Sequence, residues 1–168
     1  MRRTRTGLHA IAAIWLAACG GPDATATSTS TQAQANAVAQ PAPAPLPADA
    51  TPEQAVAYNG KRYAAGFSAE GAVIKGTLAQ GGRGDHLLVL KAGRCYRIVG
   101  AAEQTVADMD LFLYDPNGVQ THQDPSQDRF PVLGLQGEIC PVQSGAYRVQ
   151  AHMYEGAGAY AIGLFRTP

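Results

Sequence analysis

Apolar and polar residues alternate through most of the chain after residue 72. In residues 147–153, Tyr, Val, Ala and Met alternate with Arg, Gln and His, which is the period of a strand with one buried face. Turns rich in Gly and Pro separate such runs by roughly 8–12 residues, a spacing typical of antiparallel sandwiches and barrels. The pattern predicts strands at 72–78, 85–90, 95–99, 110–114, 147–153 and 160–164, with shorter ones at 130–135 and 138–140.

The segment Asp108–Gly118 carries the strongest signal. Leu111 to Tyr114 form a short apolar run with an aromatic pair, and Asp115-Pro116-Asn117-Gly118 follows with Pro and Gly at turn positions. We therefore predict a buried central strand that ends in a tight turn. Residues 121–129, in contrast, are polar and are expected to form an exposed loop.

A helix is expected just before the strands. Thr51, Pro52 and Gln54 form a capping-box start, and the helix is predicted to end at Asn59-Gly60. These elements together predict an all-β fold: an antiparallel, jelly-roll-like β-sandwich of about seven to eight strands with a short N-terminal helix.

The last predicted strand has an unusual second face. Tyr160, Ile162 and Leu164 are expected to face inward, with Ala159, Ala161 and Gly163 between them. Such small residues either let another surface approach closely or form a thin solvent-exposed face.

The first residues have the pattern of an export signal. Arg2, Arg3 and Arg5 precede an apolar run of about eleven residues, which is shorter than the roughly 20 needed to span a bilayer. The run ends in Leu16-Ala17-Ala18-Cys19, which resembles the lipobox of bacterial lipoproteins. The resemblance implies a signal peptide at 1–18 and a diacylglycerol on Cys19 that anchors the chain to the membrane. In this class of protein, an Asp directly after the acylated cysteine commonly favours retention in the inner membrane. This sequence has Gly20 at that position, which favours the outer membrane.

Residues 19–50 are rich in Ala, Thr, Ser, Gln and Pro and have almost no large apolar side chain. Such a segment is predicted to be a disordered tether, stiffened where Pro and Ala alternate. The folded domain is therefore expected at 51–168. Thirteen basic and thirteen acidic residues balance, and without the three leader arginines the mature chain is mildly acidic, which argues against a nucleic-acid partner.

Several short motifs recur through this domain at turn and strand positions. They are Gly76-x-Leu78, Gly84-Asp85-His86-Leu87, Leu90-x-Ala92-Gly93-x-Cys95-Tyr96-x-Ile98, Asp108-x-Asp110-Leu111-x-Leu113-Tyr114-Asp115-Pro116-Asn117-Gly118, Ser144-Gly145-Ala146-Tyr147-x-Val149 and Gly158-x-Tyr160. Together they resemble the bacterial pre-peptidase C-terminal domain, a β-sandwich appended to secreted proteases and other exported proteins, over about residues 76–164. The resemblance implies secretion, maturation or attachment to a polymer, and some relatives bind calcium; no peptidase precedes the domain here.

Cys95 and Cys140 are the cysteines that remain after acylation of Cys19. Because exported proteins fold in an oxidising compartment, a disulfide between them is expected. The alternative is a metal site with His86, His122 or His152, but the closely spaced ligand pairs of zinc sites are missing.

Three acids around the central strand, Asp108, Asp110 and Asp115, are candidate calcium ligands, with Asp124 and Asp128 nearby in the sequence. The alternative is that Asp108 and Asp115 accept backbone hydrogen bonds in turns, since no Asp-x-Asp-x-Asp-Gly loop is present.

His122, Asp124, Ser126 and Asp128 lie within one predicted loop. A catalytic triad usually draws its members from distant parts of a rigid scaffold, so these residues are expected to be exposed turn chemistry and the protein is not expected to be an enzyme. The sequence predicts a lipid-anchored envelope protein that binds a protein or polysaccharide ligand on the cell surface or in the periplasm. The alternative is a structural, partner-holding subunit of an envelope or export complex.

Overall fold

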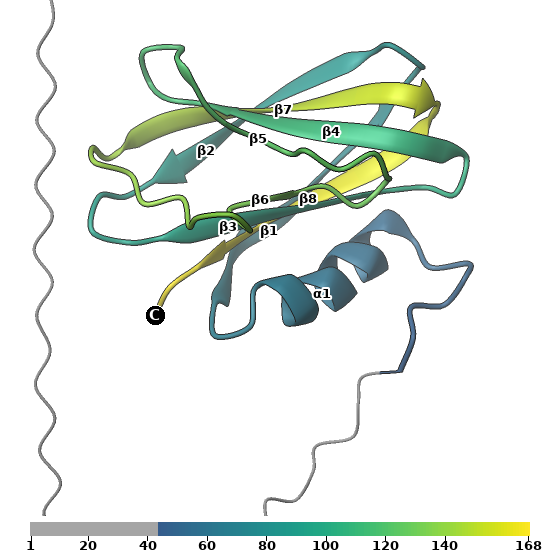
Figure 1. The fold of residues 1–168 in the computed structure, drawn as a ribbon, viewed down its shortest axis with the longest axis horizontal. Coiled ribbons are helices and arrows are strands. Elements are labelled where there is room, and N and C mark those ends of the chain that lie inside the picture. The colour runs from purple at the N-terminus through teal and green to yellow at the C-terminus, as the bar shows by residue number, and fades with distance from the viewer. Residues whose placement is uncertain (1–43) are drawn as a thin grey trace, which may run out of the picture. The chain divides into compact units, whose positions relative to one another are not determined.

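The computed structural model describes residues 44–168 as two antiparallel four-stranded sheets stacked face to face, with one helix beneath (Figure 1). The first sheet has the strand order β1-β8-β3-β6 and the second the order β2-β7-β4-β5. The predicted sandwich is therefore confirmed. The elements are α1 (Pro52–Tyr63), β1 (Ser68–Leu78), β2 (Arg83–Leu90), β3 (Tyr96–Ala102), β4 (Val106–Tyr114), β5 (Gln120–Gln123), β6 (Val132–Leu133), β7 (Gly145–Gly156) and β8 (Gly158–Arg166).

The core lies between the two sheets. Leu111 and Leu113 of β4 and Val149 of β7 are completely buried, as are Ile98 of β3 and Ile162 of β8 to within 1%. The alternation in the sequence predicted this inward face. The tyrosines of the core keep their hydroxyls bonded: the Tyr96 hydroxyl accepts from the Lys91 amide at 2.9 Å, and the Tyr147 hydroxyl donates to the Gln143 carbonyl at 3.1 Å.

Two sequence predictions about element type were wrong. Residues 120–123, expected mostly within a loop, form β5, which pairs with β4 at the edge of the second sheet. Its side chains are polar because an edge strand at the rim of a sandwich buries little, so the alternating signal is missing. Of the two short strands expected at 130–135 and 138–140, only Val132–Leu133 forms a strand, and Ile139 makes a single bridge to Tyr96.

The helix also continues beyond its predicted end. It begins at the predicted capping box, with Thr51 and Gln54 each bonded to the backbone of the other, but it runs through Asn59 and Gly60 to Tyr63. Gly60 lies inside the helix and packs against the Phe165 ring, where the Cβ of any other residue would collide with the ring. The glycine that suggested a helix end instead allows close packing.

Helix α1 covers the outer face of the first sheet, below it in Figure 1. Ala55 and Val56 of the helix pack on Ala101 of β3 and Ala161 of β8. The small residues of β8 therefore let a second surface approach, one of the two outcomes that their pattern allowed. The opposite face, on the second sheet, has no helix over it among the described residues.

A disulfide joins Cys95 and Cys140, as predicted. Cys95 directly precedes β3, and Cys140 follows Ile139, whose backbone pairs with Tyr96 at the start of that strand. The bridge closes a loop with a sequence separation of 45 residues. On the chain-entropy account, a loop of that length stabilises the fold by about 4 kcal/mol.

The predicted signal peptide, the lipobox with Cys19 and most of the predicted tether lie outside the described residues. Within the described residues, Leu46, which the sequence assigned to the tether, packs against the apolar cluster between α1 and the first sheet. No helix in residues 44–168 has both the length and the hydropathy of a membrane span.

Replacing Gly163 with Ala should disrupt the packing of α1 on the first sheet. An added Cβ would lie 2.6 Å from Cγ1 of Val56, a stiff side chain on α1. We expect the free energy of unfolding, measured in urea, to fall by about 1–3 kcal/mol. Gly137→Ala is the matched control, because nothing lies within 4 Å of the added Cβ. Equal stability of the two variants would contradict this account of the packing.

Candidate functional site

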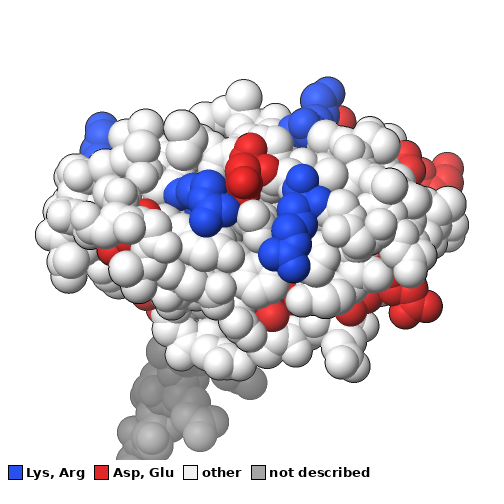
Figure 2. Space-filling view, turned by 90° about the horizontal axis from the view of Figure 1, so that it is seen from above, with Lys and Arg blue, Asp and Glu red and all other residues white. Residues whose placement is uncertain are grey.

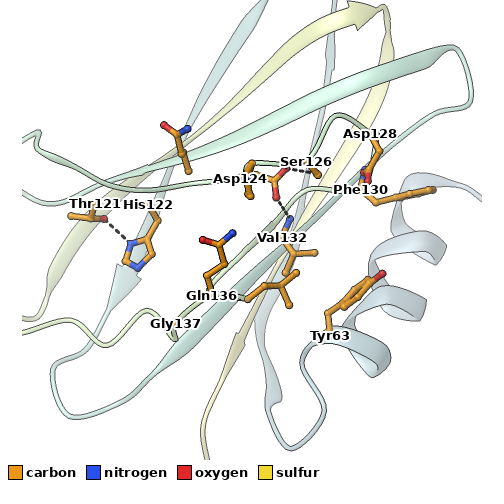
Figure 3. A pocket seen from close by; sticks show the side chains of 14 residues that line it. Tyr63, Thr121, His122, Asp124, Ser126, Asp128, Phe130, Val132, Gln136 and Gly137 are labelled. Atoms are coloured by element: carbon orange, nitrogen blue, oxygen red, sulfur yellow. Dashed lines mark hydrogen bonds between the residues drawn. The ribbon is translucent and has the colours of Figure 1, made fainter.

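A pocket of about 600 Å³ opens at the side of the sandwich where each sheet ends in a short edge strand. β5 forms one wall, the loops on either side of β6 form the opposite wall and the floor, and Tyr63 reaches in from the end of α1 (Figure 3). We call this the rim pocket. Its volume is in the range of sites that bind small molecules or single groups of larger ones.

The lining of the rim pocket combines apolar walls with neutral polar groups. Tyr63 and Phe130 supply aromatic rings, and Leu135 adds an aliphatic side chain that is about half exposed. Burial lowers the pKa of His122, which keeps the imidazole neutral near pH 7. Further polar lining comes from Gln123 and Gln136.

The charged groups at the pocket are all acidic. Asp124 and Asp128 line it, and no Lys or Arg is among its described lining residues. The pocket therefore disfavours an anionic ligand and suits a neutral or cationic one.

Asp124 holds the two walls of the rim pocket together. Its backbone amide donates to the Leu111 carbonyl of β4, so the residue continues the edge of the second sheet. Its carboxylate accepts from the Val132 amide of β6 at 3.1 Å, which reaches the first sheet, and from the Ser126 amide at 3.2 Å. Only 5% of Asp124 is exposed, so these bonds are well shielded from water.

His122 and Ser126 do not form a nucleophile–base pair. The Ser126 hydroxyl donates to the Asp124 carboxylate, and Nδ1 of His122 lies 3.0 Å from the Thr121 hydroxyl. Catalysis by serine needs a base that takes the hydroxyl proton, and the group placed here is a carboxylate already bonded to two backbone amides. The loop that the sequence marked as a polar cluster is thus the wall of a cavity.

Asp108 and Asp110 lie in β4 and do not line the rim pocket, but Met109 between them donates its amide to the carbonyl of Asp128, which does. Burial, followed by repulsion from Asp108 and Asp124, raises the pKa of Asp110 to about 6. Burial also raises the pKa of Asp108, with repulsion from Asp128 and Glu155, and one buried carboxylate oxygen of Asp108 has no hydrogen-bond partner.

Asp115 stands apart from the other two candidate calcium ligands. It follows the far end of β4, and its carboxylate accepts from the amides of Asn117 at 2.9 Å and Val119 at 2.8 Å. Asp110 and Asp115 are separated by the length of five extended residues, about 16 Å, so the three acids do not form one site. Calcium binding stays a prediction.

Among the described residues, one group has ligand atoms close enough together for a metal: Cys95, Glu138 and Cys140. Both of its sulfurs are joined in the disulfide, so they are not available as thiolate ligands. His86, a rival metal ligand in the sequence, instead makes a 2.8 Å hydrogen bond with the Tyr160 hydroxyl between the sheets.

A polar network that the sequence did not reveal crosses the outer face of the second sheet. Arg148 stacks 3.8 Å from the centre of the Tyr114 ring and makes a 2.7 Å ion pair with Asp85. Gln150 donates to the same carboxylate at 2.8 Å and accepts from Arg83 at 3.4 Å. Figure 2 looks down on this face and shows basic groups on either side of an acidic one, surrounded by mostly uncharged surface.

This network also corrects the expectation that β7 is only half buried. Gln150 and His152 are 8% and 6% exposed although they face outward, because their neighbours on β2 and β4 cover them. Burial acts to raise the pKa of Asp85, but the bonds from Arg148 and Gln150 outweigh it and lower that pKa.

Comparison with known proteins leaves the family open. No family model matches the chain, and no curated protein matches it. Among solved structures, the chain is similar to PliG of Aeromonas hydrophila, a periplasmic inhibitor of g-type lysozyme, at 14% identity over 57% of this chain and 85% of that one, with a TM-score of 0.42. This likeness is too distant to transfer a function or a site residue, and the resemblance to the pre-peptidase C-terminal domain stays a prediction.

Replacing Asp110 with Asn should make the protein more stable at neutral pH. The folded pKa of about 6 is higher than the unfolded value near 4, so the unfolded chain loses its proton first as pH rises. The free energy of unfolding of the wild type should therefore fall between about pH 4 and pH 6. In urea titrations, the free energy of unfolding of Asp110→Asn should fall less over this pH range. The variant should therefore be more stable than the wild type at pH 7.5 but not at pH 4.

Asp115→Asn is the control of opposite sign. Hydrogen bonds from the Val119 amide and from Asn117 lower the pKa of Asp115, so ionisation of this carboxyl stabilises the fold and Asn should destabilise it at pH 7.5. A loss of stability at pH 7.5 in Asp110→Asn would show that the electrostatic account is wrong.

Proposed function

We propose that the protein is a non-catalytic, lipid-anchored binding module of the bacterial envelope, and that its folded domain binds a polysaccharide at the rim pocket. The lipobox at Leu16–Cys19 supports an anchor in the outer membrane, and the Ala- and Pro-rich segment after it supports a tether between anchor and domain.

The observation that carries the proposal is the lining of the rim pocket. Aromatic rings at Tyr63 and Phe130 offer flat apolar surface, and Gln123, Gln136 and neutral His122 offer hydrogen-bond donors and acceptors. A sugar ring needs this combination, since it has an apolar face and a periphery of hydroxyls.

The charge of the pocket narrows the class of polymer. With Asp124 and Asp128 in the lining, the pocket suits neutral sugars or amino sugars better than uronic acids or phosphorylated polymers.

The alternative, a partner-holding subunit, is favoured by a different region. The outer face of the second sheet is uncovered and carries an arginine stacked on a tyrosine, residue types that are enriched at the energetic centres of protein interfaces.

Truncation of two exposed pocket residues should weaken oligosaccharide binding. We expect Leu135→Ala and Gln136→Ala each to raise the dissociation constant by about 5- to 10-fold, since each removes roughly 1 kcal/mol of contact. Calorimetry with neutral, amino-sugar and uronic-acid oligosaccharides is the measurement. Val142→Ala and Gln143→Ala, at another pair of an aliphatic residue and a glutamine outside the rim pocket, are the matched controls and should bind like the wild type.

Three outcomes would contradict the proposal. They are binding of uronic-acid oligomers alone, equal effects of the pocket and control variants, and no oligosaccharide binding by a wild-type protein that captures an envelope protein instead.

A further inference from the structure

The four edge strands of the sandwich differ in how they are protected against pairing with another chain. β1 is interrupted by a bulge between Glu70 and Ile74, β5 has four residues and a register shift, and β6 has two residues. Short length, bulges and lysines are the usual means by which proteins block their edges. Three of the four edges therefore have such protection.

β2 has none of these. Its eight residues pair with β7 in an unbroken register from Arg83↔His152 to Leu90↔Gly145. The strand contains neither Lys nor Pro. On its outward face Leu87 is 71% exposed and Val89 is 66% exposed. A long, regular edge with exposed aliphatic side chains is suited to receive another strand.

The side of the sandwich next to β2 also has a hollow that reaches the edge of the core. A hollow of about 280 Å³ lies between β1 and β2 and is lined by Ile74, Leu88 and Leu164, which belong to or pack against the main core. A strand added at β2 would extend the second sheet beside this hollow.

We infer that β2 pairs antiparallel with β2 of a second copy of this chain, so that two second sheets become one continuous sheet. A two-fold axis perpendicular to the sheet keeps outward residues opposite outward residues, so one residue of the strand lies directly opposite its own copy, with the axis midway between them. The sequence then discriminates among the registers.

Only the register centred on Leu88 matches both hydrophobicity and charge. It places Leu87 opposite Val89 twice and Asp85 opposite Lys91, the exposed residue directly after the strand. Centring on Leu87 would place Arg83 against Lys91, and centring on His86 would place Arg83 against Val89. Like charges directly opposite destabilise a sheet, while aliphatic pairs and opposite charges stabilise it.

Cysteine crosslinking in the envelope tests the inference and its register together. Cells should co-express full-length Leu87→Cys and Val89→Cys, each with its own tag, and the membranes should be analysed without reductant. Residues directly opposite have Cβ atoms about 4.5–5.5 Å apart, and diagonal ones about 7–8 Å. We expect severalfold more disulfide-linked dimer in the mixture than in cells with either variant alone.

The controls show whether a crosslink comes from the β2 pairing or from another source. Cys19 is present in every sample, so any dimer formed through it appears equally in all of them. Val142→Cys, at a residue that is 97% exposed and lies outside β2, gives the background for random collision. The variant that disrupts the pairing is Lys91→Asp, because Leu88→Lys would place a charge in the core and could unfold the domain. Lys91→Asp puts a second negative charge directly opposite Asp85 of the other copy and should reduce the yield of crosslinked dimer severalfold.

Two results would overturn the inference. One is a mixture that crosslinks no more than the Val142→Cys control while Leu87→Cys and Val89→Cys keep wild-type thermal unfolding. The other is a crosslink of equal yield with Lys91→Asp present, which would reject the register.

Discussion

The site depends on the carboxylate of Asp124. The residue extends the edge of one sheet through its backbone, and its side chain bonds the Val132 amide on the edge of the other. Sandwich sheets are otherwise held by apolar contacts, which fade towards the rim. A buried residue whose backbone amide donates to one edge and whose carboxylate accepts from the other fixes the distance between the two edges there. The rim pocket forms because Asp124 links the two edges while no side chain fills the space between them.

The rest of the domain separates support from exposed surface. The central strands β3 and β8 of the first sheet are largely buried on both faces, with the second sheet above them and α1 below, where Ala101, Ala161 and Gly163 let the helix approach. Among the described residues no helix covers the outer face of the second sheet, where Arg148, Asp85 and Gln150 form one bonded network. The sandwich thus presents three distinct regions: the rim pocket, this polar face and the unprotected edge of β2. The rim pocket, at about 600 Å³, is larger than the hollow of about 280 Å³ beside β2.

The strands with one buried face could be predicted from their alternation, and β2 and β4 follow it closely. The middle of β7 and of β8 is buried on both faces, so burial there does not alternate. The disulfide followed from the compartment and from cysteine number. β5 could not be predicted, because Gln120–Gln123 is held by backbone pairing with β4 and buries little. The rim pocket could not be predicted either. Its lining residues other than Tyr63 all lie within residues 121–137, but the hollow arises from the way this segment runs between the edges of the two sheets, which the sequence pattern does not show. The sequence grouped Asp108, Asp110 and Asp115 by proximity, although an extended strand separates its two ends.

Amide hydrogen exchange, measured by mass spectrometry with and without a bound neutral oligosaccharide, tests the central claim most directly. If the rim pocket held by Asp124 is the binding site, exchange should slow in residues 121–137 and at the end of α1 near Tyr63. The peptides that carry Asp85 and Arg148 on the outer face should stay unchanged. Slower exchange on that face, with residues 121–137 unaffected, would contradict the claim and move the binding site to the polar network.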